Sequence, residues 1–465
     1  MDGGKGNFME QHHHERSTFS GKLGFVLSAA GASVGLGNIW RFPYLAAKYG
    51  GGIFLLIYII LAMTFGYSMI IAETALGRMT KKSPVGAFGK FGKSKWLSFG
   101  GWINAIIPIL IVPYYSVIGG WVIKYLIEYI RGNGKMLAAD GYFSEFISDG
   151  VSTELCFILF CLFTLTIIYA GVRNGIERVS KFMMPILIVL SVLIAVYSVT
   201  RPGAMEGVKY FLVPNVKNFS WMTVVAAMGQ MFYSLSIAMG ILITFGSYMK
   251  KETSLEDSTR NVEVFDTAIA IMAGLMIIPA VFSFSGGDPD TLQAGPALMF
   301  ITIPKVFENM GFGTVVGILF FLLVLFAAVT SSIALTESAV STFEDELGWS
   351  RRRATVLVGV IMIALGSLSS LGYGPLAGIK IIGMQFLDFF DFLTNSVMMP
   401  IAAMLTSLFV SRIVGMKRME EEIMHGESTF RRKKIFIVMI KYLCPVFALI
   451  ILISSVANAF GWIAM

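Results

Sequence analysis

Three consecutive hydroxyl side chains, Thr330, Ser331 and Ser332, interrupt a long apolar stretch of the sequence. Hydroxyl and carbonyl oxygens are the ligands that hard cations prefer. A single Ser or Thr in an apolar helix usually bonds back to the carbonyl four residues earlier, and this simpler interpretation stays open for each hydroxyl taken alone. Three together indicate a cation site.

Three carboxylates also lie inside apolar stretches. A carboxylate surrounded by hydrocarbon is costly and by default indicates function. We expect Asp266 to belong to such a site. Glu73 and Glu337 are interpreted as structural partners that bond the backbone or a neighbouring helix.

Two further apolar stretches are interrupted in the middle by small and hydroxyl residues, at 31–38 (GASVGLGN) and 230–240 (QMFYSLSIAMG). Unwound backbone at membrane depth is tolerated only where it lines a protein cavity. The glycines at 31 and 35 could instead form a packing face. Because the two breaks fall in the first and sixth apolar stretches, they indicate two inverted halves of five helices with a site between them.

The composition identifies the medium around these elements. Of the 465 residues 56% are apolar and 14% are charged, against about 45–50% and about 25% in soluble domains. About eleven stretches have the roughly 20 apolar residues needed to cross a bilayer; they are centred near 33, 66, 114, 162, 189, 234, 274, 322, 360, 394 and 448. The predicted fold is an all-α integral membrane protein of about 11 transmembrane helices in a 5+5 inverted repeat, with helices 1 and 6 broken.

Basic residues gather in alternate loops, at 78–95, 351–353 and 431–434. The positive-inside rule therefore predicts a cytoplasmic N-terminus and, after an odd number of spans, an external C-terminus. The net charge of +7 is explained by topology rather than by nucleic-acid binding. The predicted divisions are a tail at 1–18, repeats at 19–200 and 201–411, and a cytoplasmic loop with helix 11 at 412–465.

Residues 31–43, followed by the glycines at 50–52, resemble the first-helix signature of the neurotransmitter:sodium symporter family. Residues 230–240, the hydroxyls at 330–332 and the segment 343–347 (FEDEL) are similar to its sixth and eighth helices. The resemblance covers about residues 16–463 and includes prokaryotic eleven-span members of the bacterial leucine transporter type. It implies sodium-coupled import by alternating access across the plasma (inner) membrane, with no enzymatic chemistry.

The resemblance implies two sodium sites. One uses the carbonyls of Gly31, Val34 and Ala327 with the hydroxyls of Thr330 and Ser331. The other uses Ser33, Asn38, Ser234 and Asp266. Chloride-dependent relatives hold the anion among residues matching Tyr58, Gln230, Ser234, Asp266 and Ala270. Because Ala270 has no hydroxyl and Asp266 brings a fixed negative charge, we expect chloride not to be required.

The implied substrate is an amino acid that carries its own carboxylate, because Gly35 stands where amine-transporting relatives have Asp. The walls of the implied substrate site include apolar residues and an adaptable methionine, which favours a substrate with a hydrophobic or aromatic side chain. The implied substrate residues are Ser33, Gly35, Gly37, Ile111, Tyr115, Tyr233, Ser234, Ser236, Ala238, Met239, Ser331 and Leu335.

Two gates are also implied by the resemblance. Arg41 with Asp391 would close the outer side, with Asp388 as a competing partner, and Arg16 with Asp345, near Tyr248, would close the inner side. The alternative function is a proton-coupled amino-acid permease of the same fold, titrating at Asp266 or Glu337. A channel would need pore-lining repeats or charged rings. The sequence does not predict the oligomeric state.

Overall fold

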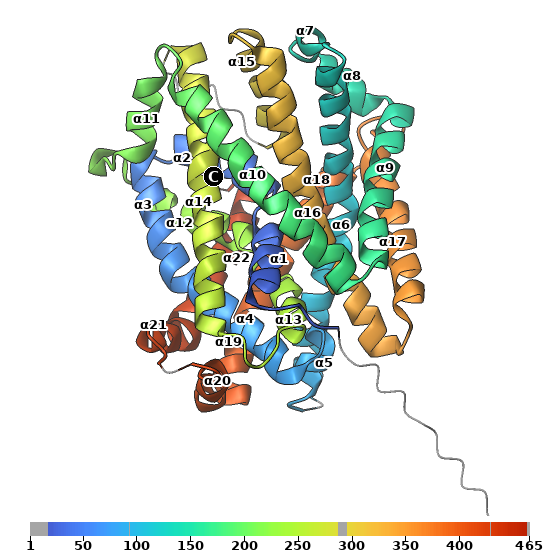
Figure 1. The fold of residues 1–465 in the computed structure, drawn as a ribbon, viewed down its shortest axis with the longest axis vertical. Coiled ribbons are helices and arrows are strands. Elements are labelled where there is room, and N and C mark those ends of the chain that lie inside the picture. The colour runs from blue at the N-terminus through green and yellow to red at the C-terminus, as the bar shows by residue number, and fades with distance from the viewer. Residues whose placement is uncertain (1–16, 93, 287–294, 428, 463–465) are drawn as a thin grey trace, which may run out of the picture.

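The computed structural model describes residues 17–92, 94–286, 295–427 and 429–462, and these residues are almost entirely helical (Figure 1). Among them, nine helices are long and apolar enough to cross a membrane. A tenth crossing is made by Lys22–Ser33 and Gly37–Lys48, which meet at 55°. The nine are Gly52–Thr80, Lys95–Ile130, Gly150–Tyr169, Val172–Val199, Leu255–Ser285, Gly313–Leu347, Arg351–Leu371, Phe386–Ile423 and Lys433–Ala459.

The remaining crossing is built from two shorter helices, α12 (Trp221–Ser234) and α13 (Ile241–Ser247), separated by residues 235–240. α12 begins with a capping box, in which the Ser220 hydroxyl accepts a hydrogen bond from the Thr223 amide at 3.1 Å. Counting both broken spans gives the eleven crossings that the sequence predicts, and the all-helical fold is confirmed in the described part of the chain.

The labelled helices correspond to these spans in order. The first span comprises α1 (Lys22–Ser33), η1 (Gly37–Arg41) and α2 (Phe42–Lys48), and the second comprises α3 (Gly52–Leu61), η2 (Ala62–Gly66) and α4 (Tyr67–Thr80). The third is α6 (Lys95–Ile130), the fourth α9 (Gly150–Tyr169), the fifth η3 (Val172–Glu177) with α10 (Arg178–Val199), and the sixth α12 with α13. The seventh is α14 (Leu255–Ser285), the eighth α16 (Gly313–Leu347), the ninth α17 (Arg351–Leu371), the tenth runs from α18 (Phe386–Asp391) through α19 (Met399–Leu408) to α20 (Met416–Ile423), and the eleventh is α21 (Lys433–Val438) with α22 (Cys444–Ala459).

Short helices lie at both ends of the molecule (Figure 1). One end carries α5 (Pro84–Gly89), α20 and α21; we call it the basic end, because the Lys/Arg-rich loops lie there. The opposite end carries α7 (Gly134–Leu137), α8 (Tyr142–Ser148), α11 (Ala204–Leu212) and α15 (Ile303–Glu308). Residue 412 lies within a helical segment, η8 (Phe409–Gly415), and the backbone leaves the helical region only at Gly415, with φ of 88° and ψ of 137°.

The packing of the spans repeats between the two halves. α6 packs against α9 as α16 packs against α17, and α4 packs against α13 as α14 packs against α1. Five is an odd number of crossings, so the sixth span starts on the side opposite to the first. The arrangement is therefore the inverted repeat that the positions of the two breaks predict.

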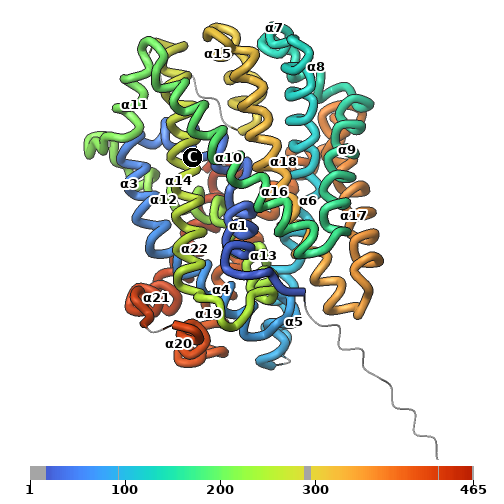
Figure 2. Tube along the Cα trace, in the orientation of Figure 1, coloured from blue at the N-terminus to red at the C-terminus, as the bar shows by residue number. Residues whose placement is uncertain are grey.

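Burial separates the centre from the lipid-facing rim. Within their most apolar windows, α6 is 78% buried and α16 is 72% buried, whereas the last span is 28% buried. The rim helices expose apolar side chains such as Leu155 on α9 and Phe182 on α10. The tube in Figure 2 shows α1 and α13 in the middle of the molecule. Both broken spans are thus held at the centre, away from lipid.

Candidate functional site

The first break lies where α1 ends at Ser33 and the backbone of Val34 leaves the helical region, with ψ of 86°. Glycine is required here for close approach. A Cβ atom on Gly35 would lie 2.6 Å from the Ser331 hydroxyl, and one on Gly37 would lie 2.4 Å from the ring of Tyr233. The chain therefore passes directly against two side chains from other spans.

The second break holds two non-glycine residues in the left-handed region, Ser236 at φ 53° and Ala238 at φ 58°. Such conformations persist only when surrounding contacts fix them. The Ser236 hydroxyl donates to the Ala32 carbonyl at 3.0 Å, and the Ala238 amide donates to a carboxylate oxygen of Glu73 at 2.8 Å. Glu73, on α4, is fully buried and is a structural partner of the backbone, as the sequence predicts.

A further hydrogen bond joins the two breaks. The side-chain amide of Gln230, on α12, donates to the Gly37 carbonyl at 3.0 Å. Together with the bond from Ser236 to Ala32, it ties the unwound part of the sixth span to that of the first. The backbone of the first break is therefore held on both sides by side chains of the sixth span.

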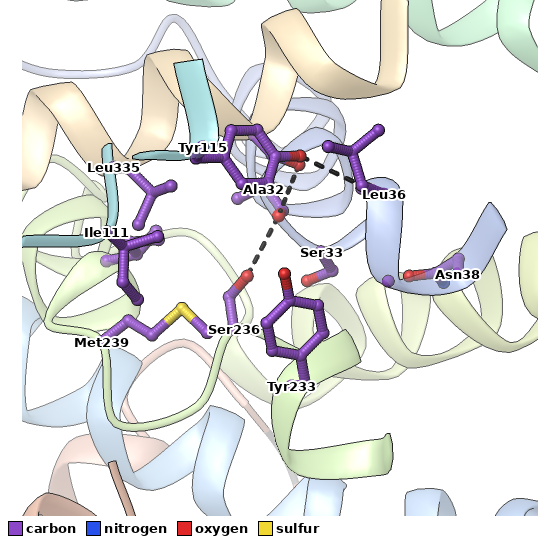
Figure 3. Close-up of a pocket in the computed structure, with 14 residues that line it drawn as sticks. Ala32, Ser33, Leu36, Asn38, Ile111, Tyr115, Tyr233, Ser236, Met239 and Leu335 are labelled. Carbon is purple, nitrogen blue, oxygen red and sulfur yellow. Dashed lines mark hydrogen bonds between the residues drawn. The ribbon is translucent and has the colours of Figure 1, made fainter. Parts of the chain in front are cut away.

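A small cavity lies between these breaks and two continuous helices, α6 and α16 (Figure 3). Tyr115 on α6 accepts a hydrogen bond from the Leu36 amide at 3.3 Å and closes one side. All the lining residues are uncharged. They are Ala32, Ser33, Gly35, Leu36, Gly37, Asn38, Ile111, Tyr115, Tyr233, Ser236, Met239, Ile241, Ser331 and Leu335.

Most of the substrate residues implied by the resemblance lie on this cavity, and two do not. Ser234 points instead to Asp266, and the Ala238 amide is bonded to Glu73. Four residues that also line the cavity, Ala32, Leu36, Asn38 and Ile241, have no substrate role in the prediction from the sequence. They adjoin assigned residues, but an unwound segment has no periodicity that would tell which of its residues face inward.

Asp266 forms the centre of a buried polar cluster beside the cavity. Its carboxylate accepts hydrogen bonds from the Asn38 amide at 2.8 Å, the Tyr58 hydroxyl at 2.9 Å and the Ser234 hydroxyl at 2.9 Å. The Ser234 hydroxyl also lies 3.0 Å from the Asn38 carbonyl oxygen. One carboxylate and several neutral oxygens from the first, second, sixth and seventh spans meet here, a donor set that suits a monovalent cation.

The three hydroxyls of α16 have three different partners. Thr330 bonds back to its own helix, at the carbonyls of Phe326 (2.9 Å) and Ala327 (3.2 Å). Ser331 crosses to the end of α1, where its hydroxyl donates to the carbonyls at positions 31 (3.2 Å) and 32 (3.1 Å). The Ser332 hydroxyl lies 3.2 Å from that of Thr164 on α9.

These contacts bring Thr330 and Ser331, together with the Ala327 carbonyl, to the end of α1 where Gly31 and Val34 lie. A Cβ on Gly31 would be 3.1 Å from the Thr330 side chain. The oxygens of this second group are all neutral. Ser332 takes no part in it, because its hydroxyl faces α9.

A second, larger cavity lies between Tyr233 and the end opposite the basic end. Arg41, Asp388 and Asp391 all line it. The Arg41 guanidinium lies 5.3 Å from the centre of the Tyr233 ring. Asp391 accepts hydrogen bonds from Tyr114 and Asn395. The described residues include no ion pair that joins Arg41 to either aspartate, and Tyr233 lines both cavities and separates them.

On the basic side of the cavity, Tyr248 connects several segments. Its hydroxyl donates to Glu337 at 2.6 Å, and its carbonyl accepts the Phe19 amide at 3.1 Å. Arg351 binds Glu337 through its two terminal guanidinium nitrogens, at 3.0 and 2.5 Å. Glu337 is thus a structural partner, as predicted. Arg351 had no signal beyond its membership of a basic cluster.

The predicted inner pair is placed only in part. Asp345 accepts a hydrogen bond from the Ser83 amide at 2.6 Å and lies 3.9 Å from the ammonium of Lys82. Arg16 lies outside the described residues.

The fold and the site together define a class of protein. Broken first and sixth spans that enclose a central cavity within an inverted repeat are the architecture of secondary transporters. The crystal structure of MhsT in complex with L-phenylalanine is similar, with a TM-score of 0.84 and 36% sequence identity; the match covers 95% of this chain and 100% of that one.

The sequence profile of the sodium:neurotransmitter symporter family matches residues 16–137 and 143–461. The chain belongs to this family. It is similar to the sodium-dependent transporter YhdH of Bacillus subtilis, with 35% identity over 88% of this chain and 91% of that one. A sodium-dependent transporter of Haemophilus influenzae is 32% identical over 96% of this chain and 100% of its own length. The human sodium- and chloride-dependent GABA transporter 2 is 28% identical over 88% of this chain and 75% of its own length.

Proposed function

We propose that the chain is a sodium-coupled symporter that imports a hydrophobic or aromatic amino acid by alternating access. The observation that carries the proposal is the position of Asn38. This residue lines the central cavity and also donates to the buried carboxylate of Asp266. An ion bound at Asp266 and a ligand in the cavity would therefore share one side chain, which couples the binding of one to the binding of the other.

The proposed transport cycle uses two sodium ions. In one site, the carbonyls of Gly31, Val34 and Ala327 and the hydroxyls of Thr330 and Ser331 would bind the ion, and the neutral oxygens suit a monovalent charge. Ser331 already spans the gap between α16 and α1. Sodium there would reinforce a contact that the protein makes by itself.

The other site would use the Ser33 carbonyl with Asn38, Ser234 and Asp266. The last three side chains bond to one another, so sodium would replace hydrogen bonds with ionic contacts. The negative charge of Asp266 would balance the ion. Chloride is not required in this proposal, because Ala270 offers no hydroxyl to an anion and Asp266 would repel it.

The proposed substrate class follows from the walls of the cavity. Its apolar side is made by Ile111, Met239 and Leu335, and no lining side chain could pair with a charged substrate side chain. Gly35 leaves room for a substrate carboxylate near sodium. The similar MhsT structure contains L-phenylalanine, which supports an aromatic or large apolar amino acid.

We further propose that the basic end is cytoplasmic and that the protein lies in the plasma membrane. The large cavity then opens outward. The outer pair Arg41 and Asp391 is separated, whereas Tyr248 holds Phe19 on the inner side. This arrangement corresponds to an outward-facing state, and closure would bring Arg41 to Asp391 or Asp388.

The test is uptake of labelled tryptophan, tyrosine and leucine into liposomes that contain the purified protein. The outer solution would contain sodium, potassium or choline, with chloride or gluconate, and protein-free liposomes would be the control. We expect uptake only with sodium and equal uptake in gluconate. Uptake that ignores sodium but follows a pH gradient would replace this proposal with a proton-coupled permease.

A further inference from the structure

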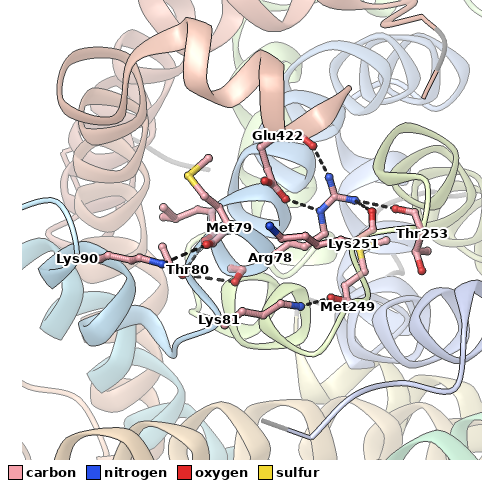
Figure 4. Close-up of polar contacts among 11 residues, drawn as sticks. Arg78, Met79, Thr80, Lys81, Lys90, Met249, Lys251, Thr253 and Glu422 are labelled. Carbon is pink, nitrogen blue, oxygen red and sulfur yellow. Dashed lines mark hydrogen bonds and ion pairs between the residues drawn. The ribbon is translucent and has the colours of Figure 1, made fainter. Parts of the chain in front are cut away.

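Arg78, at the basic end of α4, is completely buried and joins three segments that are distant in the sequence (Figure 4). Its Nε donates to a carboxylate oxygen of Glu422 on α20 at 2.6 Å, and a second nitrogen donates to the backbone carbonyl of the same residue. A third nitrogen donates to the carbonyls of Thr253 at 2.7 Å and Lys251 at 3.3 Å. Every guanidinium nitrogen therefore has a partner.

The segment contacted through Glu422 is the connector, which we define as residues 416–427 and 429–434 between the tenth and eleventh spans. It has further links to the same neighbours. Arg432 pairs with Glu263 on α14 at 2.8 Å, and its guanidinium lies 4.6 Å from the centre of the Tyr67 ring on α4. The Arg431 amide donates to Glu256, also on α14, at 3.0 Å.

The segments that Arg78 joins are also packed against each other without intervening side chains. A Cβ atom on Gly77 would lie 1.9 Å from the Ile243 carbonyl, and one on Gly246 would lie 2.3 Å from the Thr74 carbonyl. Such contacts mean that the backbones of α4 and α13 touch directly and form a closely packed pair. The connector is thus bound to a compact unit made of α4, α13 and the start of α14.

A second unit stands on the other side of the cavity. α6, α9, α16 and α17 pack against one another, and they lie together on one side of the molecule, with α3, α11 and α14 on the other (Figures 1 and 2). The cavity wall supplied by this unit includes Ile111, Tyr115, Ser331 and Leu335. Opening the cavity alternately to each side requires the two units to move relative to each other.

We propose that Arg78 is a positioning residue that makes the connector a moving part of the transporter, displaced together with α4, α13 and α14 when the cavity changes access. The inference rests on the proposed function. Its physical basis is that displacement of α4 without the connector would separate the buried guanidinium from the Glu422 carboxylate, leaving it only the neutral carbonyls of Thr253 and Lys251, and breaking such a buried ion pair is strongly unfavourable.

The test measures distances between spin labels by pulsed electron resonance on the full chain in lipid nanodiscs. Labels would be placed on three exposed positions, Glu421 in the connector, Glu252 in the loop after α13, and Arg353 at the start of α17. The partly exposed Cys156 would be replaced by Ser. Measurements with sodium plus tryptophan, tyrosine or leucine would be compared with measurements in potassium alone.

We expect the 252–353 and 421–353 distances to shift together while the 421–252 distance stays constant. A shift of 252–353 with no shift of 421–353 would place the connector on the static unit and overturn the inference alone. If the 252–353 distance does not shift under any condition, the alternating access of the proposed function is contradicted, and the inference fails with it. The two failures are therefore distinguishable.

Arg78→Gln and Glu422→Gln test whether this one contact transmits the motion, and Lys417→Gln, at an exposed position on the same helix, is the matched control. We expect both test variants to broaden the 421–252 distance and slow turnover while sodium-dependent ligand binding persists, and the control to change neither. A narrow, unchanged 421–252 distance in both test variants would overturn the role of Arg78. If Arg78→Gln does not fold, the Glu422→Gln variant still tests the role of the contact, and the distances in the protein without these substitutions still test whether the connector moves.

Discussion

Removing the charge of Asp266 is the sharpest test of the ion site. In Asp266→Asn the side chain keeps its size but offers one acceptor oxygen where the carboxylate offers two. The carboxylate now accepts from Asn38, Tyr58 and Ser234 at 2.8–2.9 Å. The amide nitrogen that replaces the other oxygen can donate to the Tyr58 hydroxyl, which also keeps its 3.2 Å contact with Ser234. The variant therefore disturbs a neutral network slightly and an ion site strongly.

The expected magnitude follows from charge. Two unit charges about 4 Å apart attract by about 4 kcal/mol at an effective dielectric constant of about 20. The carboxylate must also be stripped of water, and the amide oxygen still binds the ion, so only part of that attraction is lost. A contact to a charged group is worth about 1.5–3 kcal/mol, which weakens sodium binding by about 10- to 150-fold.

The assay is sodium-dependent uptake into liposomes over a range of sodium concentrations. Asp140→Asn is the control, since that carboxylate is exposed at the end opposite the basic end, where it pairs with Lys305, and it lies outside the central and outer cavities and the gates. The half-saturating sodium concentration should rise in the first variant and not in the second. An unchanged sodium dependence in Asp266→Asn, with uptake intact, would refute the assignment of Asp266 to an ion site.

Three further predictions concern the cavity and its second ion site. Ser331→Ala should raise the half-saturating sodium concentration about fivefold, for a neutral ligand worth about 1 kcal/mol, whereas Ser332→Ala, facing α9, should leave it unchanged in the same uptake assay. Gly35→Ala places a methyl group 2.6 Å from the Ser331 hydroxyl and should weaken substrate binding by about 1–3 kcal/mol, measured by competition with labelled tryptophan. Met239→Ala enlarges the cavity on its apolar side and should raise the ratio of tryptophan uptake to leucine uptake by about tenfold. An equal loss of uptake for both amino acids would contradict the role of Met239 in specificity.

The sequence was informative wherever composition conflicts with the lipid environment. The glycine and hydroxyl residues at 31–38 and 230–240 do not favour a continuous membrane helix, so both breaks could be predicted. A carboxylate in hydrocarbon needs a compensating partner, so the sequence alone predicts that Asp266, Glu73 and Glu337 have functional or structural partners. Glycine at 35 and 37 is explained by contacts with Ser331 and Tyr233.

Partners across the chain could not be predicted in the same way. The contact of Arg78 with Glu422 joins residues separated by 344 positions, and nothing local distinguishes this arginine from the others in its basic loop. The same holds for Arg351, whose bond to Glu337 depends on how α16 and α17 pack. Three adjacent hydroxyls at 330–332 likewise give no local sign of which one bonds its own helix.

The hydrogen bonds between the two breaks have a consequence for coupling. Gln230 binds the Gly37 carbonyl and Ser236 binds the Ala32 carbonyl, so the first and sixth spans are held together at their breaks by direct hydrogen bonds of the protein. Ser331 links this pair to α16 through hydrogen bonds of 3.1–3.2 Å to neutral carbonyls, each worth only about 1 kcal/mol. Sodium bound between α16 and the end of α1 would therefore have a large effect on the position of α16 relative to the two broken spans. It would have little effect on the shape of the broken spans themselves. Ion binding in this protein should be detected as a change in the distance between the two units, with the geometry of the breaks preserved.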